Sequence, residues 1–287
     1  MKLLNKAVAI TGGNQGLGFE IAKHCLLEGA SVAICARNDD LLKNAYDDLT
    51  QYKKEHQLLI YRTADVSDHD DVEAFFKLCI DSFGKVDVLV NNAGIHGSKN
   101  SIYDPDFDMV NWIKAINVNL FGALYMCLAF VPHFKRNGSG KIINLSGGGA
   151  TSPMPGMSAY AASKAALVRF TETIALELKP YNIDVNAIAP GAMNTRLLDD
   201  VLVNGKGKVT DEYYEKALKQ KESGGTPPSK GAELCVYLAS DECNGVTGKL
   251  ISAVWDDWKN LHKHIPDLDS DIYTLRRIVP EDRGISF

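Results

Sequence analysis

The stretch Ala7-Val-Ala-Ile-Thr-Gly-Gly-Asn-Gln-Gly-Leu-Gly18 joins a short apolar run to a glycine-rich turn. Residues 7–10 predict a buried strand, and residues 16–29 predict a helix that begins in the turn. Glycine at this point lets the backbone pass close to a pyrophosphate, whose charge meets amide donors and the positive end of the helix. Glycine also serves tight strand–helix turns for steric reasons alone, but the place directly after the first strand favours a dinucleotide site. The turn residues that we expect to contact the dinucleotide are Thr11, Gly12, Asn14, Gln15, Gly16, Leu17 and Gly18.

Strand-like and helix-like runs alternate along the rest of the chain. The expected strands are residues 31–36, 58–62, 86–90, 141–145, 183–188 and 249–254. The expected helices are residues 39–54, 68–83, 109–136, 158–179, 211–221 and 229–239. Strands separated by helices of this length predict βαβ crossovers and a parallel sheet. We therefore expect an α/β domain with a doubly wound parallel sheet.

The segments that do not fit regular elements all follow predicted strands. A parallel sheet of this kind binds ligands beyond the carboxyl ends of its strands. The segments expected there are residues 12–18, Asp65, residues 91–94, residues 146–149 and residues 190–195. Their convergence on one edge predicts one site. The segments 204–208 and 223–228 are rich in residues that end helices and strands. They could form a mobile flap over that site or a plain surface insertion, and the sequence favours neither.

Composition excludes several classes of protein. The 287 residues are 45% hydrophobic and 23% charged, which is ordinary for a globular chain. A net charge of −5 argues against nucleic-acid binding. The six cysteines form no C-x-x-C pair and predict buried thiols in a reducing compartment rather than a metal site. We find no signal peptide and no uninterrupted apolar run that would cross a bilayer, so we expect a cytoplasmic protein with no membrane partner.

The segment Tyr160-Ala-Ala-Ser-Lys164 places a phenol and an ammonium on one face of a helix. A tyrosine pKa of about 10 is too high for proton exchange at neutral pH, and a lysine one turn later can favour the tyrosinate electrostatically. Alone, the pair also suits an ordinary helix with an interfacial tyrosine and a surface lysine. Together with the glycine turn, it indicates a nicotinamide-dependent oxidoreductase.

The end of the second predicted strand bears on the choice of cofactor. An acidic residue there would bind the adenosine ribose hydroxyls of NAD, but Ala36 and Arg37 occupy the position. A small residue followed by a guanidinium suits a 2′-phosphate and favours NADP. NAD stays open as the alternative, because an arginine can also stack on adenine.

The motifs occur in the order and spacing of a known family. The matching positions are Thr11-Gly-x-x-x-Gly-x-Gly18, Asp65-Val66, Asn91-Asn-Ala-Gly94, Asn119, Tyr160-x-x-x-Lys164 and Pro190-Gly191. This set resembles the short-chain dehydrogenase/reductase family over about residues 5–254. The resemblance implies a single-domain Rossmann-type fold with about seven parallel strands and helices on both faces. We expect a dinucleotide-binding and catalytic domain at 1–254 and an extension at 255–287.

The resemblance also implies roles for single residues. Tyr160 is the expected general acid/base, Lys164 binds the nicotinamide ribose and lowers the tyrosine pKa, and Asn119 supports a water of the proton relay. The residues expected along the rest of the cofactor are Arg37, Asp65, Val66, Asn91, Ala93, Gly94, Pro190, Gly191, Met193 and Thr195.

The chain departs from the family pattern at two places. The family usually has a serine thirteen positions before the tyrosine, and Gly147 stands there, with Ser146 one residue earlier. We favour Ser146 as the group that polarises the substrate carbonyl, reached through a bulge at the glycines; Ser152 or a backbone amide is the alternative. The family's last strand commonly leads into Asp-Gly-Gly, whereas Trp255 and Trp258 follow it here. They could line a pocket or cover a neighbouring subunit, although anchoring of the tail is favoured.

The sequence therefore predicts an NADP(H)-dependent enzyme that interconverts a small alcohol and a ketone or aldehyde. Family members are often dimers or tetramers, so a homo-oligomer is expected. Two alternatives stay open: a cofactor-binding regulator or scaffold without turnover, motivated by Gly147, and an epimerase or dehydratase acting on a sugar-like substrate. The sequence does not name the substrate.

Overall fold

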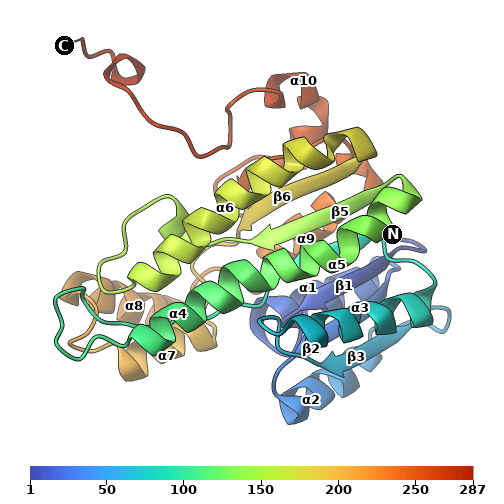
Figure 1. The fold of residues 1–287 in the computed structure, drawn as a ribbon, viewed down its shortest axis with the longest axis horizontal. Helices are drawn as coiled ribbons and strands as arrows, with labels where there is room; N and C mark the ends of the chain where they lie inside the picture. Colours follow the sequence, from blue (N-terminus) through green and yellow to red (C-terminus); the bar gives the residue numbers. More distant parts are fainter. Residues whose placement is uncertain (287) are drawn as a thin grey trace.

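Within residues 1–286, which the computed structural model describes, seven parallel strands form one central sheet (Figure 1). The order is β3-β2-β1-β4-β5-β6-β7. The strands are β1 (Ala7–Thr11), β2 (Ser31–Ala36), β3 (Leu59–Thr63), β4 (Val88–Asn91), β5 (Gly140–Leu145), β6 (Ile183–Ala189) and β7 (Leu250–Ser252). The expected doubly wound α/β fold is confirmed.

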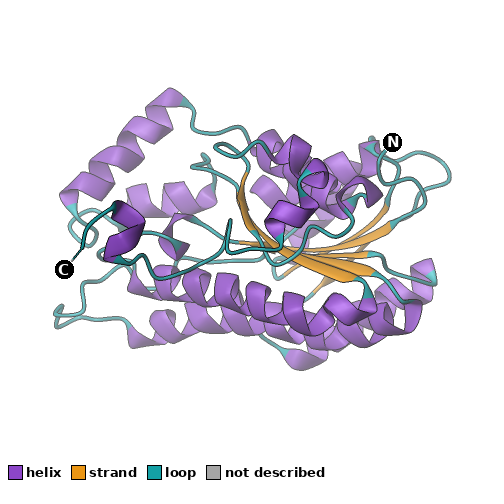
Figure 2. Ribbon diagram, turned by 90° about the horizontal axis from the view of Figure 1, so that it is seen from above, coloured by secondary structure: helices purple, strands orange, loops and turns teal. Residues whose placement is uncertain are grey.

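Helices cover both faces of the sheet (Figure 2). They are α1 (Gly16–Leu27), α2 (Asp39–Thr50), α3 (His69–Phe83), α4 (Met109–Ile116), α5 (Gly122–Asn137), α6 (Ser158–Leu178), α7 (Arg196–Asn204), α8 (Asp211–Ser223), α9 (Pro228–Ala239) and the short α10 (Ile265–Leu268). One buried cluster joins α1, α2 and α9 to the sheet, and a second joins α3, α5 and α6 to it. The two clusters are the cores on either side of the strands.

The strand order reverses at β1, which lies between β2 and β4. Successive crossovers therefore run away from β1 in opposite directions, toward β3 and toward β7. At such a switch point the loops that follow two neighbouring strands diverge and leave a crevice at their carboxyl ends. The loops after β1 and β4 are the glycine turn and the Asn91–Gly94 segment, so the fold brings these two motifs to one crevice.

Local chemistry sets the helix ends. The side chain of Asp68 accepts hydrogen bonds from the amides of Asp70 and Asp71 and so caps α3. Either Ser67 or Asp68 fits the sequence pattern, and the structure selects Asp68. At the other end Gly84 adopts a left-handed conformation with φ of 73°, which stops the helix at little steric cost.

One predicted helix is interrupted by a different kind of helical turn in the structure. Residues 109–136 are expected as a single α-helix, but the segment Asn117–Phe121 between α4 and α5 is π-helical. Such one-turn insertions are common at functional sites. Asn119 lies in this segment, and its side chain bonds to a neighbouring loop and helix, as described below. The spacing of apolar residues does not reveal the extra residue of a π-helical turn, because the buried apolar face of the helix continues through the turn.

Two further differences lie near the carboxyl end. Helix α7 is absent from the sequence prediction; it is only nine residues long, and of its apolar residues only Leu198 and Val201 are buried. The expected last strand at 249–254 is shorter, and only Leu250–Ser252 pairs with β6. Beyond Ser252 the chain turns, since the Asp256 carboxylate accepts a hydrogen bond from the Ser252 amide at 2.6 Å.

The segment after the last strand divides into two parts. Trp258, Leu261 and Leu268 are buried in the same core cluster as α1 and α9, and Trp258 packs against Tyr237 of α9 with ring centroids 5.5 Å apart. Beyond about residue 275 the chain extends away from the body of the molecule (Figure 1). Trp258 is therefore an anchor of the tail, whereas Trp255 is 87% exposed.

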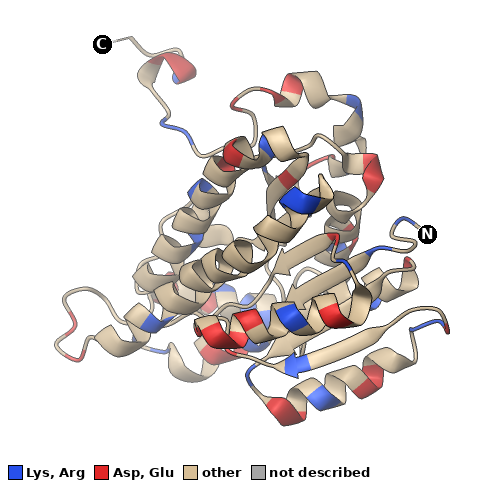
Figure 3. Cartoon of the chain, turned by 45° about the vertical axis from the view of Figure 1, so that its right-hand side comes forward, with Lys and Arg blue, Asp and Glu red and all other residues tan. Residues whose placement is uncertain are grey.

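Acidic and basic residues are interspersed along the helices (Figure 3). One continuous helical stretch, Met109–Asn137, is long and apolar enough to span a membrane by length and composition, with a mean hydropathy of 1.6. Half of its most apolar part is buried inside the protein, and α5 contributes to the core beneath the sheet. These properties are also those of the core helix of a globular domain.

Candidate active site

A single large cleft of about 1780 Å³ opens at the carboxyl ends of the strands. Its walls include the glycine turn, the loop after β4, the residues after β5, Tyr160 and Lys164 of α6, and the loop after β6. The volume exceeds the usual range of a small-molecule pocket, roughly 300–1,000 Å³. The cleft therefore has room for a dinucleotide and a second molecule together.

The glycine turn has the shape that close approach of a phosphate requires. Gly12 and Gly16 have positive φ angles of 65° and 56°, which favour glycine. A Cβ atom on Gly18 would lie 2.2 Å from the Gly12 carbonyl oxygen, so only glycine fits there. Gln15 precedes α1 and makes no side-chain cap bond, which leaves the first amides of the helix to the cleft. These features fit a pyrophosphate.

Hydrogen bonds tie the turn to the loop after β4. The Thr11 hydroxyl oxygen accepts from the amides of Asn92 and Ala93, both at 3.0 Å. The Asn92 side chain donates to the carbonyl oxygens of Thr11 and Gly12 at 2.9 and 3.0 Å. Asn92 lines the cleft, although the sequence analysis does not single it out.

Its neighbour Asn91 has a different place. Asn91 is buried in the sheet, where its amide donates to Asn144 of β5 at 2.9 Å, and it is not among the residues that line the cleft. Adjacent residues on a strand point to opposite faces, so of two successive asparagines only one can face the crevice. Asn91, expected along the cofactor, therefore bonds within the central sheet, whereas Asn92, Ala93 and Gly94 line the cleft.

At the far end of the cleft, Arg37 follows β2 with its side chain half exposed. Its Nη1 atom lies 3.7 Å from a carboxylate oxygen of Asp65. Partial burial works against ionisation of Asp65, but two hydrogen bonds from Ser67 and the charge of Arg37 hold its pKa below the usual value. Val66 lines the cleft and Asp65 does not.

Tyr160 and Lys164 both line the cleft from the first turns of α6. Lys164 is only 4% exposed, and its Nζ donates to the Leu145 carbonyl oxygen at 2.6 Å. Nζ lies 5.8 Å from the centroid of the Tyr160 ring. Gly94 makes room for it, since a Cβ there would lie 3.4 Å from Nζ.

The pKa values of this pair run against the sequence-based expectation. Burial raises the pKa of Tyr160 to about 12, with a further contribution from Tyr213. Burial lowers the pKa of Lys164 to about 8. The expected lowering of the tyrosine pKa by Lys164 is thus not found in this structure. The physical reason is that desolvation dominates both groups and that the ammonium is directed to the Leu145 carbonyl.

Asn119 is held by three hydrogen bonds. Its Oδ1 accepts from the Ile95 amide at 2.8 Å, and its Nδ2 donates to the Ile95 carbonyl and to the Ser163 hydroxyl, both at 2.9 Å. The side chain therefore links the π-helical segment to the loop after β4 and to α6. Its Oδ1 and the Nζ of Lys164 both face Gly94. The structure places Asn119 beside the pair, with its side chain committed to the protein.

The position opposite the tyrosine hydroxyl belongs to Gly147. A Cβ on Gly147 would lie 2.3 Å from the Tyr160 hydroxyl oxygen, so the tyrosine occupies the space that a side chain would need. The bulge expected to bring Ser146 there is not seen. The Oγ of Ser146 is buried, with no hydrogen-bond partner in the described part of the chain. Ser152 is exposed and does not line the cleft.

The loop after β6 forms the opposite wall. Pro190, Gly191, Met193 and Thr195 all line the cleft. A Cβ on Gly16 would lie 3.6 Å from Thr195, which shows that this loop meets the glycine turn. Met193 also forms a β-bridge with Gly225 that closes the base of the α7–α8 segment.

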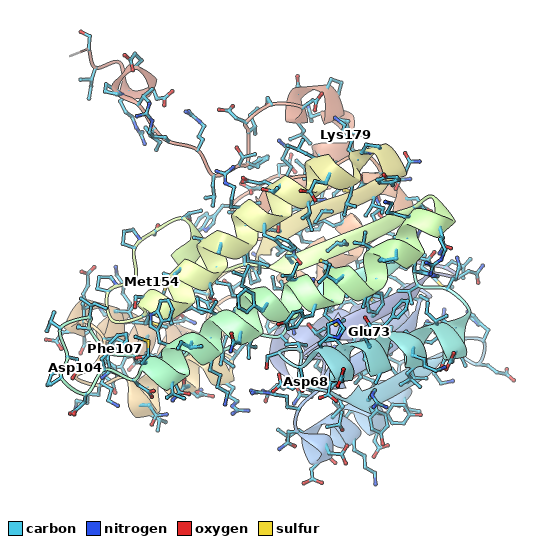
Figure 4. All side chains as sticks on the ribbon, viewed as in Figure 1. Asp68, Glu73, Asp104, Phe107, Met154 and Lys179 are labelled. Carbon is cyan, nitrogen blue, oxygen red and sulfur yellow. The ribbon has the colours of Figure 1, made fainter. Side chains whose placement is uncertain are left out.

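The α7–α8 segment, left open between a flap and a surface insertion, flanks the cleft. Tyr213, Lys216 and Gln220 of α8 contribute to its wall, and Met154 packs with Leu198 and Tyr213 beside Tyr160. In Figure 4, Met154 and Phe107 lie at the end of the molecule that carries α7 and α8. This end of the cleft lies away from Arg37.

Three polar residues on that side are missed by the sequence analysis. His96 and Lys99 come from the loop after β4, and Asp200 comes from α7. Lys99 pairs with the Asp200 carboxylate at 2.5 Å. The only signal in the sequence is that His96 stands two residues after Asn91-Asn-Ala-Gly94, a place that topology brings to the crevice.

Comparison with known proteins gives a consistent result. A model of the short chain dehydrogenase family matches residues 6–204. A 3-oxoacyl-(acyl-carrier-protein) reductase from Chlamydia muridarum is 33% identical over 252 residues, covering 87% of this chain and 96% of the relative. The 3beta-hydroxysteroid dehydrogenase 1 of Eggerthella lenta is 35% identical over 247 residues, covering 86% and 91%.

Solved structures agree with the fold. A xylitol dehydrogenase with bound NAD+ superposes with a TM-score of 0.79 at 26% identity, covering 88% of this chain and 98% of that one. A gluconate 5-dehydrogenase from Burkholderia cenocepacia, in complex with NADP and tartrate, superposes with a TM-score of 0.75 at 26% identity, covering 88% and 94%. These similar proteins thus include one bound to each nicotinamide dinucleotide.

Proposed function

The chain belongs to the short-chain dehydrogenase/reductase family and is an oxidoreductase, and we propose that it interconverts a small alcohol and a ketone or aldehyde with NADP(H). The observation that carries this proposal is the shared cleft. A turn shaped for a pyrophosphate and the Tyr160–Lys164 pair line one continuous space, with room for a second molecule. Neither feature alone would specify the chemistry.

The bound dinucleotide would supply the hydride in reduction and accept it in oxidation. Tyr160 gives the proton of its hydroxyl to the substrate oxygen in reduction and takes it back in oxidation. Lys164, which lines the cleft one helical turn after Tyr160, would bind the nicotinamide ribose. Asn119 holds the loop after β4 against α6, and we assign to it the support of the relay water that returns a proton to Tyr160.

The cofactor preference rests on the residues that follow β2. Arg37 lines the cleft at the end remote from Tyr160, and its guanidinium is half exposed, so it is accessible to an anion. A 2′-phosphate would compete with Asp65 for the guanidinium, and the 3.7 Å separation shows that the present contact is loose. These facts support NADP over NAD.

The partner and the setting follow as further parts of the proposal. The substrate is a small alcohol or carbonyl compound. Helices α4, α5 and α6 expose Ile113, Leu128 and Leu176, which supports a homo-oligomer built on these helices. The six cysteines are buried and unpaired, which supports a reducing, cytoplasmic setting.

The test is a turnover assay on a panel of ketones and aldehydes. Wild-type protein and Arg37→Ala are each assayed with NADPH and with NADH, and oxidation of the reduced nicotinamide is followed by absorbance. We expect wild-type turnover with a preference for NADPH, and a selective rise of the NADPH KM by roughly tenfold or more in Arg37→Ala. Absence of turnover with the whole panel contradicts the activity, and an equal change for both cofactors contradicts the choice of NADP.

A further inference from the structure

A hydrogen-bond donor is missing opposite the hydroxyl of Tyr160, the proposed acid/base. The position that faces its hydroxyl is Gly147, which offers no side-chain donor. Ser152 is exposed outside the cleft, and Ser146 borders the cleft one residue before Gly147 with its hydroxyl buried and unpartnered. A carbonyl oxygen that approaches Tyr160 therefore needs a second hydrogen bond from another part of the cleft.

His96 is the polar side chain that packs directly against the tyrosine ring. The two ring centroids are 5.0 Å apart, and the planes meet at 88°. His96 is only 7% exposed, yet it lines the cleft. Burial lowers the pKa of His96, and the charges of Lys99 and Lys164 act in the same direction, while Asp200 opposes them.

The hydrogen-bonding capacity of His96 is unused within residues 1–286. Its Nδ1 atom is buried and lacks a hydrogen-bond partner. The nearest carboxylate oxygen, on Asp200, lies 3.8 Å away, which is too long for a direct hydrogen bond. That carboxylate is held by Lys99 at 2.5 Å. A buried imidazole without partners is costly to keep unless a ligand satisfies it.

We propose that His96 is a catalytic residue that holds the substrate oxygen beside Tyr160, in the role left open by Gly147. The proposal rests on the oxidoreductase function proposed above and adds a group to its site. The substrate oxygen then lies between the imidazole and the tyrosine hydroxyl. The Lys99–Asp200 pair closes the side of the ring that faces α7.

The chemistry balances without a further reactant. In reduction, the hydride adds to the carbonyl carbon and the Tyr160 proton adds to the oxygen, while His96 keeps its own proton and donates only a hydrogen bond. In oxidation, the hydride leaves the carbon and the hydroxyl proton passes to Tyr160. A neutral imidazole can donate or accept through either tautomer. Because Nδ1 has no close partner, neither tautomer is locked, and the ring can serve a carbonyl or an alcohol.

The test compares three variants with the carbonyl compound that wild-type protein reduces fastest. His96→Phe keeps an aromatic ring against Tyr160 but removes both nitrogens. His96→Gln keeps an amide donor of similar reach. His264→Phe makes the same change on an exposed histidine of the tail and is the matched control. Steady-state kcat and KM and the Kd for NADPH are measured for each.

We expect kcat to fall roughly 10²-fold in His96→Phe, as for loss of one donor to a developing oxyanion, with the NADPH Kd within threefold of wild type. His96→Gln recovers at least a tenth of wild-type kcat, and His264→Phe matches wild type. Equal kcat in His96→Phe and wild type overturns the inference. If wild-type protein reduces nothing in the panel, the proposed function fails as well; if turnover depends on Tyr160 but not on His96, only this inference fails.

Discussion

At the scale of single residues, the contact between Gly147 and Tyr160 sets the site apart from its family pattern. The tyrosine hydroxyl sits where a side chain at 147 would begin. The space that the family serine would need at position 147 is thus occupied by the tyrosine hydroxyl rather than filled by Ser146. The size of the residue at position 147 therefore limits where the Tyr160 hydroxyl can lie.

Gly147→Ala tests this arrangement. The added Cβ would lie 2.3 Å from the tyrosine oxygen, so the hydroxyl must move away from the substrate position. We expect kcat to fall by roughly tenfold or more, with the NADPH Kd little changed, because the glycine turn is remote. Gly148→Ala is the control, since a Cβ there meets nothing within 4 Å. Unchanged kcat in Gly147→Ala would show that the hydroxyl does not work from this position.

Lys164 gives a prediction about pH and stability. Its pKa is about 8 in the folded protein against 10.5 for an ordinary lysine, so the unfolded chain binds more protons between these values. Stability contributed by this group therefore rises with pH over that window, because the cost of burying the ammonium disappears. Lys164→Met removes the cost at all pH values.

We expect the free energy of unfolding of Lys164→Met, relative to wild type, to decrease by about 2 kcal/mol between about pH 7.5 and 9.5. The buried cysteines have raised pKa values and lower the stability of both proteins at alkaline pH, so their effect cancels in the difference. Urea unfolding at the two pH values measures the difference. A difference that stays constant contradicts a depressed lysine pKa.

The place of a residue in the site could be predicted where a sequence motif specifies it, but not where contacts between distant residues decide it. Tyr160, Lys164 and the glycines are expected in the cleft from the motifs taken together, and they line it. Which of Asn91 and Asn92 faces the crevice depends on strand register. The direction of the two pKa shifts depends on burial, and His96 matters only through a tyrosine that is distant in sequence.

At the scale of elements, the π-helical segment at Asn117–Phe121 joins three parts of the site. Its Asn119 bonds to both backbone groups of Ile95 and to Ser163. Most regular helices and strands are predicted by periodicity. The π-helical turn and α7 could not be predicted, because the first is stabilised by a side chain bonding across the fold and the second is a helix of only nine residues that buries two of its side chains.

Asn119→Ala measures what this junction contributes. The change leaves the Ile95 amide and carbonyl without partners in a largely buried place, at a cost of about 2–4 kcal/mol of unfolding free energy. Urea denaturation gives the value. Asn260→Ala, at an asparagine whose side chain bonds only to the exposed neighbours Asp257 and Lys263, should stay within about 0.5 kcal/mol of wild type. A loss in Asn119→Ala no larger than in this control would contradict the structural role of the junction.

At the scale of the whole molecule, the segment after residue 254 is part of the core for about half its length. Trp258, Leu261 and Leu268 are buried with α1 and α9. Leu275 packs on a smaller cluster with Val168 and Leu250, and its amide donates to Glu172 at 2.6 Å. The sequence predicted a boundary at 254, which marks the end of the family pattern rather than the end of the packed core.

Two truncations separate the parts of the tail. Removal of residues 277–287 should change the free energy of unfolding by less than about 1 kcal/mol, because most of this part is exposed. Removal of residues 255–287 deletes three buried side chains, each worth roughly 2–5 kcal/mol, and should prevent stable folding. Urea unfolding and limited proteolysis report both. A fully stable protein ending at 254 would contradict the packing of the tail.

The central claim is that Tyr160 is the acid that completes hydride transfer to a carbonyl carbon. The most direct measurement is a single-turnover reduction with NADPH carrying deuterium at the transferred position, in wild type and in Tyr160→Phe. The account predicts deuterium on the carbinol carbon of the wild-type product, and a rate at least roughly 10²-fold lower in Tyr160→Phe with NADPH affinity unchanged. A phenylalanine variant that transfers the label at the wild-type rate, or a product without label, would contradict it.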